Sequence, residues 1–587
     1  MKVLFFSPHA FFQIHALPEA LVAESLKLAG HEVEVINCNG IFSNSCVCMP
    51  TSIIDDAKSR EKICKQCIRN RKAINSEFKF TTSNLESYVT EKDLDWVNAE
   101  ILKVTIHNFK HYSINGIPLA RYALYELLME LKISGTSLTH EQWDKFLPKL
   151  RNALTTYIGI QSILEKSTID RVVLYNSLYS VNRIVSAVAN SKGVPSFSLH
   201  AGHHLRDRIR QLTIFKGNGA SFFLNSHPYL TEIRDVPLTL TEVKQIESHV
   251  RELVNATSPW VYSVKNLKLP CLDIRQLIGA RPDQKIVLAV MRSNDELNSV
   301  RLAGVDVFSK TEIFSSQVEW VNWLKEFCKE HPDIFVVFRI HPREFPNKRE
   351  GVTSEHAHKF LEQINKLDLP KNMRLNLPTD GLSLHELLKI SDLVLNNSST
   401  AGLEASLFGI PVLGLGGDLY AFDRSLQVEP VDLEDYRSCI LKLTRTGWDF
   451  KKVIIAYRWL GFLLSDVAID ISDGYSQSLS GFNRMASFVG RGLRKLGMPY
   501  PNVTITAEVR KRNNPLKEIQ KLTHAITQDT DSHLGVFKRM RVGSRNLEVK
   551  LIQDAYLRLV ECVTSPNDPE IEKRMAQILP GTYREMT

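Results

Sequence analysis

The chain has 587 residues, a length that corresponds to three or four domain-sized units, and 43% of its residues are hydrophobic, which is enough for buried cores. Charged residues make up 24% of the sequence, as is usual for a globular protein. The formal net charge of +8 is a mild excess that suits anionic nucleotides or an anionic membrane surface. Because basic and aromatic residues do not concentrate on one segment, we expect no nucleic acid among the partners.

The first residues, MKVLFFSPHAFF, contain one Lys, a short apolar stretch and no small-residue cleavage site. We interpret them as a first strand and not as a signal peptide. No run approaches the roughly 18 apolar residues that a spanning helix needs. The expectation is a cytoplasmic protein whose contact with the inner face of the cytoplasmic membrane is at most peripheral.

The first forty residues predict a β-α-β unit. Strands at 2–7 and 31–37 flank a helix at 18–29, which has a proline at its first position and a glycine after its end. This opening is Rossmann-like but lacks the glycine-rich dinucleotide fingerprint. Its first loop carries His9 and His15 instead.

Five of the nine cysteines fall between residues 38 and 67. A C-x-C and a C-x-x-C can supply four thiolates to a tetrahedral ion, which predicts a structural zinc held by Cys46, Cys48, Cys64 and Cys67, with Cys38 able to replace Cys46 or Cys48. The alternative is five reduced thiols in an ordinary insert, since the expected compartment argues against a disulfide framework.

Residues 70–168 are polar with helical periodicity and show no recognisable chemistry. A strand at 171–175, a helix at 181–191 and a strand SFSLHAGHH follow, and 238–254 predicts an amphipathic connecting helix. The second α/β half begins with KIVLAVMRSNDE at Lys285.

The stretch 334–415 carries the most informative pattern. IFVVFRI predicts a buried parallel strand that leads to His341-Pro-Arg-Glu, and alternation places Arg339 and His341 on the same face. A capping box begins a helix at Ser383, and DLVLNN predicts a strand that ends in Asn-Ser-Ser-Thr. The next helix, 400–408, precedes a third apolar run, VLGLGG, and its N-terminus together with the hydroxyls is typical of an anion site.

Written as SD-x(4)-NSS-x(4)-EA-x(3)-G-x-P, with R-x-HP-R-E upstream, this stretch resembles the donor-binding domain of GT-B-fold glycosyltransferases. It is most similar to bacterial capsule and surface-polysaccharide enzymes, including those resembling Kdo- and sialyl-transferases. The resemblance covers roughly 1–40, 170–205 and 285–460. It implies that the nucleotide phosphate is contacted by His341, Ser398, Ser399 and Thr400 and the ribose by Glu404. Arg339 or Arg343 would add positive charge, and Arg292 and Ser293 of the turn after Lys285 are secondary donor-site candidates.

The same resemblance implies roles in the first half. His15, in an H-x-x-P setting, would be the catalytic base, with His9 as second choice. His200, Gly202, His203 and His204 would lie at the cleft or face solvent, with Gly202 allowing a ligand to approach the backbone. For each of these residues a purely structural role, such as a cap or a packed loop, is the competing interpretation.

The implied architecture is α/β, with two Rossmann-like domains facing a cleft. We expect an acceptor domain at 1–280 with a helical, cysteine-rich insert at 38–168, a donor domain at 281–455, and returning helices with a helical extension at 456–587. The basic clusters Arg510-Lys-Arg and Lys538-Arg-Met-Arg are either solvated faces or a docking surface for anionic lipid or polysaccharide.

The implied activity is transfer of a sugar from a nucleotide-activated donor to a hydroxyl of a surface glycan or glycolipid, with inversion and without a catalytic cofactor. We discount the metal-binding D-x-D of other transferases, because Asp529-Thr-Asp lies in a polar late segment. The rival interpretations are a nucleotide-sugar epimerase of similar two-domain fold and a non-catalytic scaffold in a polysaccharide assembly complex.

Overall fold

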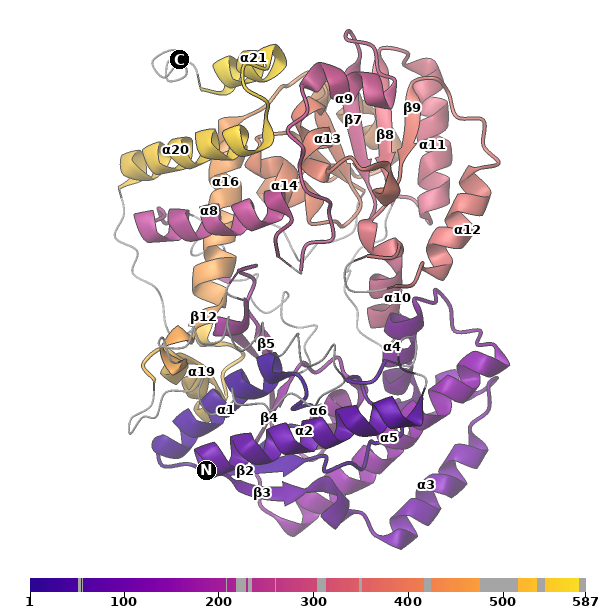
Figure 1. Ribbon diagram of the computed structural model, residues 1–587, viewed down its shortest axis with the longest axis vertical. Helices are drawn as coiled ribbons and strands as arrows, with labels where there is room; N and C mark the ends of the chain where they lie inside the picture. Colours follow the sequence, from indigo (N-terminus) through magenta and orange to yellow (C-terminus); the bar gives the residue numbers. More distant parts are fainter. Residues whose placement is uncertain are drawn as a thin grey trace.

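The computed structural model comprises two α/β units, the N-terminal unit below and the second unit above in Figure 1. It describes residues 1–50, 54, 56–206, 208–217, 229–230, 235–258, 260–302, 313–347, 351–415, 424–475, 516–535 and 544–579. Within these residues, no helix combines the length and the apolar character needed to cross a membrane.

The first unit is built on a seven-stranded sheet with the order β12-β6-β5-β4-β1-β2-β3. β1 to β5 run parallel, and β6 and β12 are antiparallel to their neighbours. The strands are β1 (Lys2–Phe6), β2 (Glu32–Asn37), β3 (Thr81–Asn84), β4 (Arg171–Tyr175), β5 (Ser196–Ala201), β6 (Gln211–Lys216) and β12 (Ile469–Asp470). The central strands β1 and β4 are apolar after their first residue because helices cover both faces of the sheet.

Two layers of helices cover this sheet. The core on one face is formed with α1 (Gln13–Leu28), α2 (Ala57–Phe78) and α19 (Ile519–Thr527). The core on the other face is formed with α3 (Glu91–Lys103), α4 (Leu119–Leu131), α5 (His140–Lys166) and α6 (Ser180–Ser191). Short 3-10 turns are η1 (Leu85–Tyr88), η2 (Phe109–His111) and η3 (Arg208–Arg210).

The second unit has an all-parallel sheet with the order β11-β10-β7-β8-β9. Its strands are β7 (Lys285–Val290), β8 (Ile334–Arg339), β9 (Met373–Asn376), β10 (Leu393–Asn396) and β11 (Val412–Gly414). One face packs against α11 (Gln317–Glu330), α12 (Glu355–Ile364) and α15 (Leu433–Leu443). The other packs against α8 (Leu240–Asn255), α9 (Cys271–Ile278), α13 (Leu384–Ile390), α14 (Ala401–Leu407), α16 (Phe450–Gly461), α20 (Arg545–Val563) and α21 (Pro569–Ile578).

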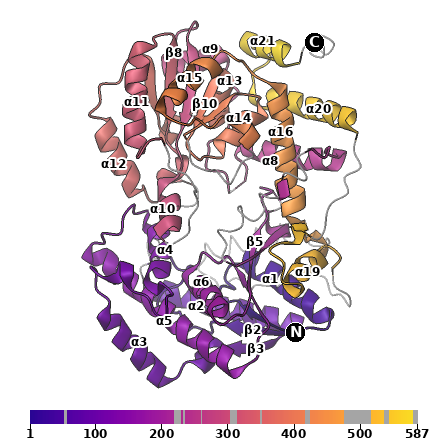
Figure 2. The same ribbon diagram turned by 180° about the vertical axis from the view of Figure 1, so that it is seen from behind.

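The chain passes between the units more than once, as the rear view in Figure 2 shows along α16. α16 continues into a π-helical segment, Phe462–Val467, which leads to β12 on the edge of the first sheet. On the opposite side α4 meets α10 (Asn294–Leu302). There the buried Lys132 ammonium donates to the carbonyl oxygens of Arg343 (2.6 Å) and Val352 (3.0 Å), so charge-assisted hydrogen bonds join the units.

The structure confirms the predicted fold class, two Rossmann-like α/β units with helices after residue 455 that return to both. It differs from the sequence expectation in two places. β3 lies inside the stretch expected to be an insert, because its polar sequence TTSN belongs to an edge strand that needs no apolar face. α1 begins at Gln13, so Pro18 sits inside the helix, where burial of the preceding turn, including Ala16 and Leu17, offsets the missing hydrogen bond. The basic clusters at 510–512 and 538–541 lie outside the described residues.

Candidate functional site

Both sheets place their first strand next to their fourth, since each has the doubly wound order 3-2-1-4-5. The chain winds in opposite directions from this point, so the loops after β1 and β4, and after β7 and β10, diverge and leave room for a ligand. The residues singled out in the sequence lie mainly at these two switch points.

A pocket of about 120 Å³ opens at the switch point of the second unit, and we call it the switch-point pocket. It is lined by the ends of β7 and β8, by the turn after β10, and by residues 260–263 of the segment that follows α8. Five of the residues predicted to bind the donor line it together: Arg339, His341, Ser399, Thr400 and Glu404.

His341 follows β8 and caps the 3-10 turn η4 (Pro342–Glu344). Its Nδ1 accepts a hydrogen bond from the backbone N–H of Arg343 at 3.2 Å, which leaves the proton of the neutral ring on Nε2. Burial lowers the pKa of His341 to about 4, and the cations Arg343, Arg339 and Lys132 act in the same direction against Asp295. At neutral pH the ring is an uncharged N–H donor.

The polar turn after β10 is held from below by Asn396. Its Oδ1 accepts from the backbone N–H of Ser399 at 3.1 Å, and the side chain is buried. A Cβ at Gly402 would come within 2.4 Å of Asn396 Nδ2, so α14 approaches this strand closely only with glycine there. The Ser399 Oγ accepts from the backbone N–H of Ala401 at 3.3 Å, which leaves its O–H free to donate.

Glu404 projects from α14 at the rim of the pocket. Its Oε2 accepts from Nε2 of the buried His385 at 3.0 Å. This contact orients the carboxylate and leaves Oε1 for a ligand. His385 follows the capping-box Ser383, and sequence reasoning missed it because a helical histidine gives no signal until β10 and α14 are placed beside it.

Arg339 lines the pocket, but its guanidinium is buried and donates to Asn376 Oδ1 and to the Leu382 carbonyl (3.1 Å). Burial lowers its pKa to about 10, against the charges of Glu404, Asp380 and Glu386. Arg339 is charged at neutral pH, so it adds a positive field beneath the pocket.

The remaining donor candidates lie outside the lining. Arg343 forms a buried ion pair with Asp295 at 3.0 Å and donates to the Tyr262 hydroxyl at 3.1 Å. Ser293 donates to Asp295 at 2.6 Å, and Arg292 donates to Asn294 at 3.1 Å. Ser398 takes a left-handed backbone conformation (φ 54°) within the turn. These residues shape the loops around the pocket.

The switch point of the first unit gathers aromatic rings and histidines from β1, α1, β4 and β5. His15 stacks on Tyr175 with ring centroids 4.4 Å apart, and His200 stacks on the same tyrosine at 6.2 Å. His9 meets Tyr179 edge-on at 5.4 Å. Burial lowers the pKa of His15 to about 3, and the charges of His200, His9 and Arg208 add to the effect. His15 is therefore a neutral imidazole at neutral pH.

Arg208 links the two switch points. Its guanidinium lies 4.8 Å from the ring centroid of Trp260, and Trp260 lines the switch-point pocket. The same guanidinium is close enough to His15 and His203 to lower the pKa of both rings after burial. Tyr262, also in the pocket lining, meets His341 edge-on at 6.1 Å. Neither Trp260 nor Tyr262 was predicted, because residues 260–263 carry neither periodicity nor a motif.

The histidines at the end of β5 and in the turn after it have two different surroundings, Arg208 for two of them and α8 for the third. Burial lowers the pKa of His203 to about 3 and that of His200 to about 4, with Arg208 contributing to both. His204 instead contacts the Gln245 carbonyl of α8 at 3.2 Å. A Cβ at Gly202 would lie 2.4 Å from the Gln211 Cβ, so this glycine is required for packing against β6 and not for the expected approach of a ligand.

The five cysteines between residues 38 and 67 lie close enough to influence one another's pKa values. Cys46 and Cys48 are hydrogen-bonded to each other, and contacts with Cys48 and His9 hold the pKa of Cys46 below its usual range. Cys38, Cys64 and Cys67 line the adjoining cavity, where burial and, after it, the charge of the nearby Cys46 raise their pKa values. Across the described parts of the chain, no three His, Cys, Asp or Glu side chains converge as metal ligands. The structural zinc at Cys46, Cys48, Cys64 and Cys67 therefore stays a prediction, and metal analysis of the purified protein is its direct test. Asp529 of the D-x-D pairs with Lys216 at 3.1 Å.

The sequence matches no protein-family model and no curated protein. Among solved structures, it is similar to KpsC of Thermosulfurimonas dismutans, a beta Kdo 2,4 transferase, with 14% identity, 52% of this chain and 82% of that chain covered, and a TM-score of 0.31. The UDP-GlcNAc 2-epimerase of Neisseria meningitidis bound to UDP-GlcNAc has 11% identity, coverage of 80% and 98%, and a TM-score of 0.26. The spinosyn rhamnosyltransferase SpnG has 11% identity, coverage of 79% and 95%, and a TM-score of 0.21. Transferases and epimerases, the two enzyme classes weighed from the sequence, are both represented.

Proposed function

We propose that the protein is a glycosyltransferase that moves a sugar from a nucleotide-activated donor to a hydroxyl of a glycan or glycolipid acceptor, with inversion and without a catalytic metal. The observation that carries this proposal is the switch-point pocket, where an imidazole N–H donor, two hydroxyl side chains, a buried arginine and an oriented carboxylate surround one small space. Donors of this kind suit a phosphate, and a carboxylate suits the two hydroxyls of a ribose.

In this proposal His341 and Ser399 donate hydrogen bonds to the phosphate of the donor through Nε2–H and O–H. Thr400 adds a second hydroxyl from the same turn. Because α14 has only seven residues, we assign the phosphate contact to these side chains and not to a helix dipole. Glu404, oriented by His385, accepts from the ribose hydroxyls.

His15 is the proposed base that takes the proton of the attacking hydroxyl. Its ring is neutral at neutral pH, so its lone pair is free to accept, but its pKa of about 3 makes it a weak base in the ligand-free protein. Burial is the main cause, and the Arg208 charge adds to it. A donor phosphate that pairs with Arg208 would remove that contribution and make His15 more basic when the substrates are in place.

Arg208 is accordingly the proposed cation that reaches the departing phosphate from the first unit. It lies against Trp260 of the pocket lining and near the histidines, so one guanidinium could serve both halves of the reaction. Positive charge at this place stabilises the leaving group in the transition state.

The test is an incubation of the protein with CMP-, UDP-, GDP- and CDP-linked sugars, with and without glycan acceptors, followed by mass spectrometry. A transferase forms an acceptor product that is one sugar heavier and releases the nucleotide in equal amount. A change in the sugar configuration without transfer would assign the chain to the epimerases. No reaction and no stabilisation by any nucleotide sugar would favour the scaffold and overturn the proposal.

A cytoplasmic location with peripheral contact at an anionic membrane belongs to the same proposal and rests on the basic clusters of the sequence. Co-sedimentation with anionic and neutral vesicles tests it. Equal recovery of the protein with both kinds of vesicle would overturn the proposed contact with an anionic membrane.

A further inference from the structure

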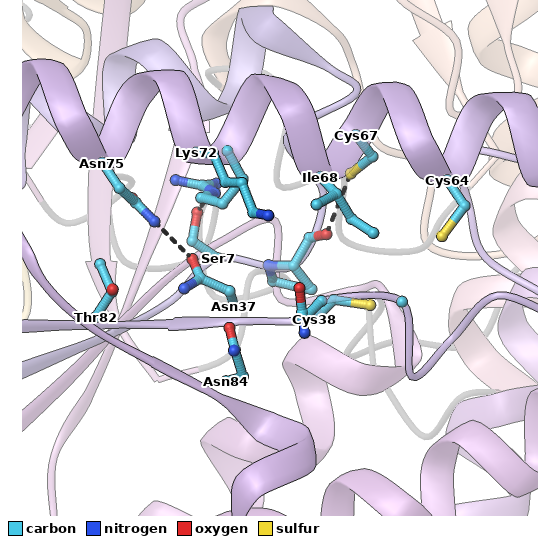
Figure 3. A pocket seen from close by; sticks show the side chains of 14 residues that line it. Ser7, Asn37, Cys38, Cys64, Cys67, Ile68, Lys72, Asn75, Thr82 and Asn84 are labelled. Carbon is cyan, nitrogen blue, oxygen red and sulfur yellow. Dashed lines mark hydrogen bonds between the residues drawn. The ribbon is translucent and has the colours of Figure 1, made fainter.

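A second cavity, of about 430 Å³, lies in the first unit and plays no part in the mechanism above. Figure 3 shows it between α2 on one side and the ends of β2 and β3 on the other. We call it the α2 cavity. Its volume lies within the range of small-molecule sites and exceeds that of the switch-point pocket.

The spacing of the residues on α2 creates one wall. Cys64, Ile68, Lys72 and Asn75 recur every three or four positions and project from the same face of the helix, as Figure 3 shows. The opposite wall is formed at the carboxyl ends of the strands by Asn37, Asn39, Thr82 and Asn84. Four asparagine amides and two hydroxyls, those of Ser7 and Thr82, therefore contribute polar groups to the lining. Asn37 already accepts from Asn75 Nδ2 at 3.1 Å and donates to the Ser83 carbonyl at 3.2 Å.

The charges of the lining have one sign. Arg71 and Lys72 contribute positive charge, and the described lining contains no Asp or Glu. Arg71 is buried and faces Glu19 at 3.8 Å, but the exposed Lys72 ammonium has no ion pair or hydrogen bond within the described chain. In Figure 3 the Lys72 side chain extends from α2 towards the space above Asn37 and Cys38.

The lining residues limit the chemical class of ligand that the cavity can bind. No aromatic ring is present among the described lining residues on which a nucleotide base would stack. Many amide and hydroxyl groups around a single unpaired ammonium match a polyhydroxyl ring that carries one anionic group. Burial keeps the pKa values of Cys38, Cys64 and Cys67 above their usual range, so these thiols are neutral and do not repel an anion.

The α2 cavity also borders the proposed catalytic loop. Ser7 and Pro8 line it, and the next residue, His9, belongs to the histidine cluster. α2 braces this loop through Cys67, which donates to the Pro8 carbonyl at 3.7 Å, and through Asn70, which donates to the Ala10 carbonyl at 3.0 Å. A glycan with its attacking end at His15 would have to pass Pro8 to reach the cavity.

We propose that the α2 cavity binds an acidic sugar residue of the acceptor glycan, with the carboxylate of that sugar at Lys72 and its hydroxyls at the asparagine side chains. This inference rests on the proposed transferase function and names the acceptor as an anionic polysaccharide.

The thiols of the cavity provide a readout that is independent of activity. The experiment measures the rate at which an uncharged maleimide alkylates Cys64 in the full chain, by peptide mass spectrometry, with Cys439 of the second unit as internal reference. Glucuronate, sialate and Kdo are added in turn at millimolar concentration, with glucose as the neutral sugar and acetate as the free anion. At least one acidic sugar should slow alkylation of Cys64 threefold or more, while glucose and acetate leave the rate unchanged.

Lys72→Gln should abolish this protection, and Lys62→Gln is the matched control. Both lysines are exposed on α2, but Lys62 does not line the cavity. Loss of a charge-assisted hydrogen bond should weaken acidic-sugar binding about tenfold in Lys72→Gln only.

Three results would overturn the inference: no protection by any acidic sugar, equal protection by acetate, or protection that survives in Lys72→Gln. Nucleotide-sugar binding is measured on the same samples. If it is present while protection fails, only the inference falls; if it is absent, the proposed function falls, whatever the thiols show.

Discussion

The two units share a strand order but differ in what stands at the carboxyl ends of their strands. In the second unit, hydroxyls, an N–H donor, a buried arginine and an oriented carboxylate line a small pocket. In the first unit, His15 and His200 stack on Tyr175 at the switch point, and amides, thiols and a lysine line a larger cavity beside it. The comparison teaches that topology sets where a ligand can sit, and the loop residues set which ligand it is.

The largest effect is expected from replacement of His15, which should change turnover through the first unit without changing donor binding by the second. His15→Asn removes the proposed base and should lower turnover by about 10²- to 10⁴-fold, with nucleotide-sugar affinity unchanged. Steady-state kinetics and calorimetry together check this. Turnover within a few-fold of the native value would show that His15 is not the base. The catalytic role assigned to the first unit would then fall.

In the second unit, the expected effect of a substitution is weaker nucleotide-sugar binding. His341→Ala removes the Nε2–H donor and should weaken nucleotide-sugar binding by about ten- to thirtyfold, since one hydrogen bond to a charged phosphate is lost. His358→Ala, an exposed substitution on α12 of the same unit, is the control. Equal affinities of the two variants would remove His341 from the donor site.

Gly402→Ala tests the packing beneath the pocket. The new Cβ would lie 2.4 Å from Asn396 Nδ2, so the turn at Ser399 must shift. We expect a loss of about 1–3 kcal/mol in unfolding free energy, measured by urea denaturation, together with weaker donor binding. Gly351→Ala adds the same methyl group where nothing lies within 4 Å and should leave both unchanged. A stable Gly402→Ala variant with native affinity would contradict this packing account.

The smallest effect is a pH dependence of stability. Burial, with the neighbouring His204 charge, lowers the pKa of His249 to about 3 in the folded chain, against about 6.5 when unfolded. Between these values the unfolded chain binds more protons, so stability is lost as pH falls below about 6.5.

At pH 5 the His249 contribution is about 2 kcal/mol relative to pH 7. His249→Gln should therefore reduce the fall in the urea midpoint between pH 7 and pH 5, whereas substitution of the exposed His140 should not. An unchanged pH dependence in His249→Gln would refute the assignment.

Much of the second unit could be predicted from its sequence. IFVVFRI is a buried strand because it is apolar throughout, and Ser383 with Glu386 forms the expected capping box. Neither β3 nor the start of α1 was predicted, because a polar edge strand has no apolar alternation and a proline usually marks a helix start.

The candidate site, like the fold, was predicted only in part. Arg339, His341, Ser399, Thr400 and Glu404 line one pocket, and it was the resemblance of the motif that first grouped them. Arg343 could not be told from Arg339 by sequence, because its ion pair with Asp295 depends on the distant turn after β7. Trp260, His385 and Arg208 could not be predicted, because their positions at the site depend on contacts between segments that are distant in the sequence.

The central claim is that the switch-point pocket binds a nucleotide sugar, and titration calorimetry with CMP-, UDP-, GDP- and CDP-linked sugars tests it most directly. The native protein should bind one nucleotide class with micromolar affinity, and Glu404→Gln should weaken that binding at least tenfold through the ribose contact. Absence of binding by all four classes, or equal binding by the native protein and Glu404→Gln, would contradict the account.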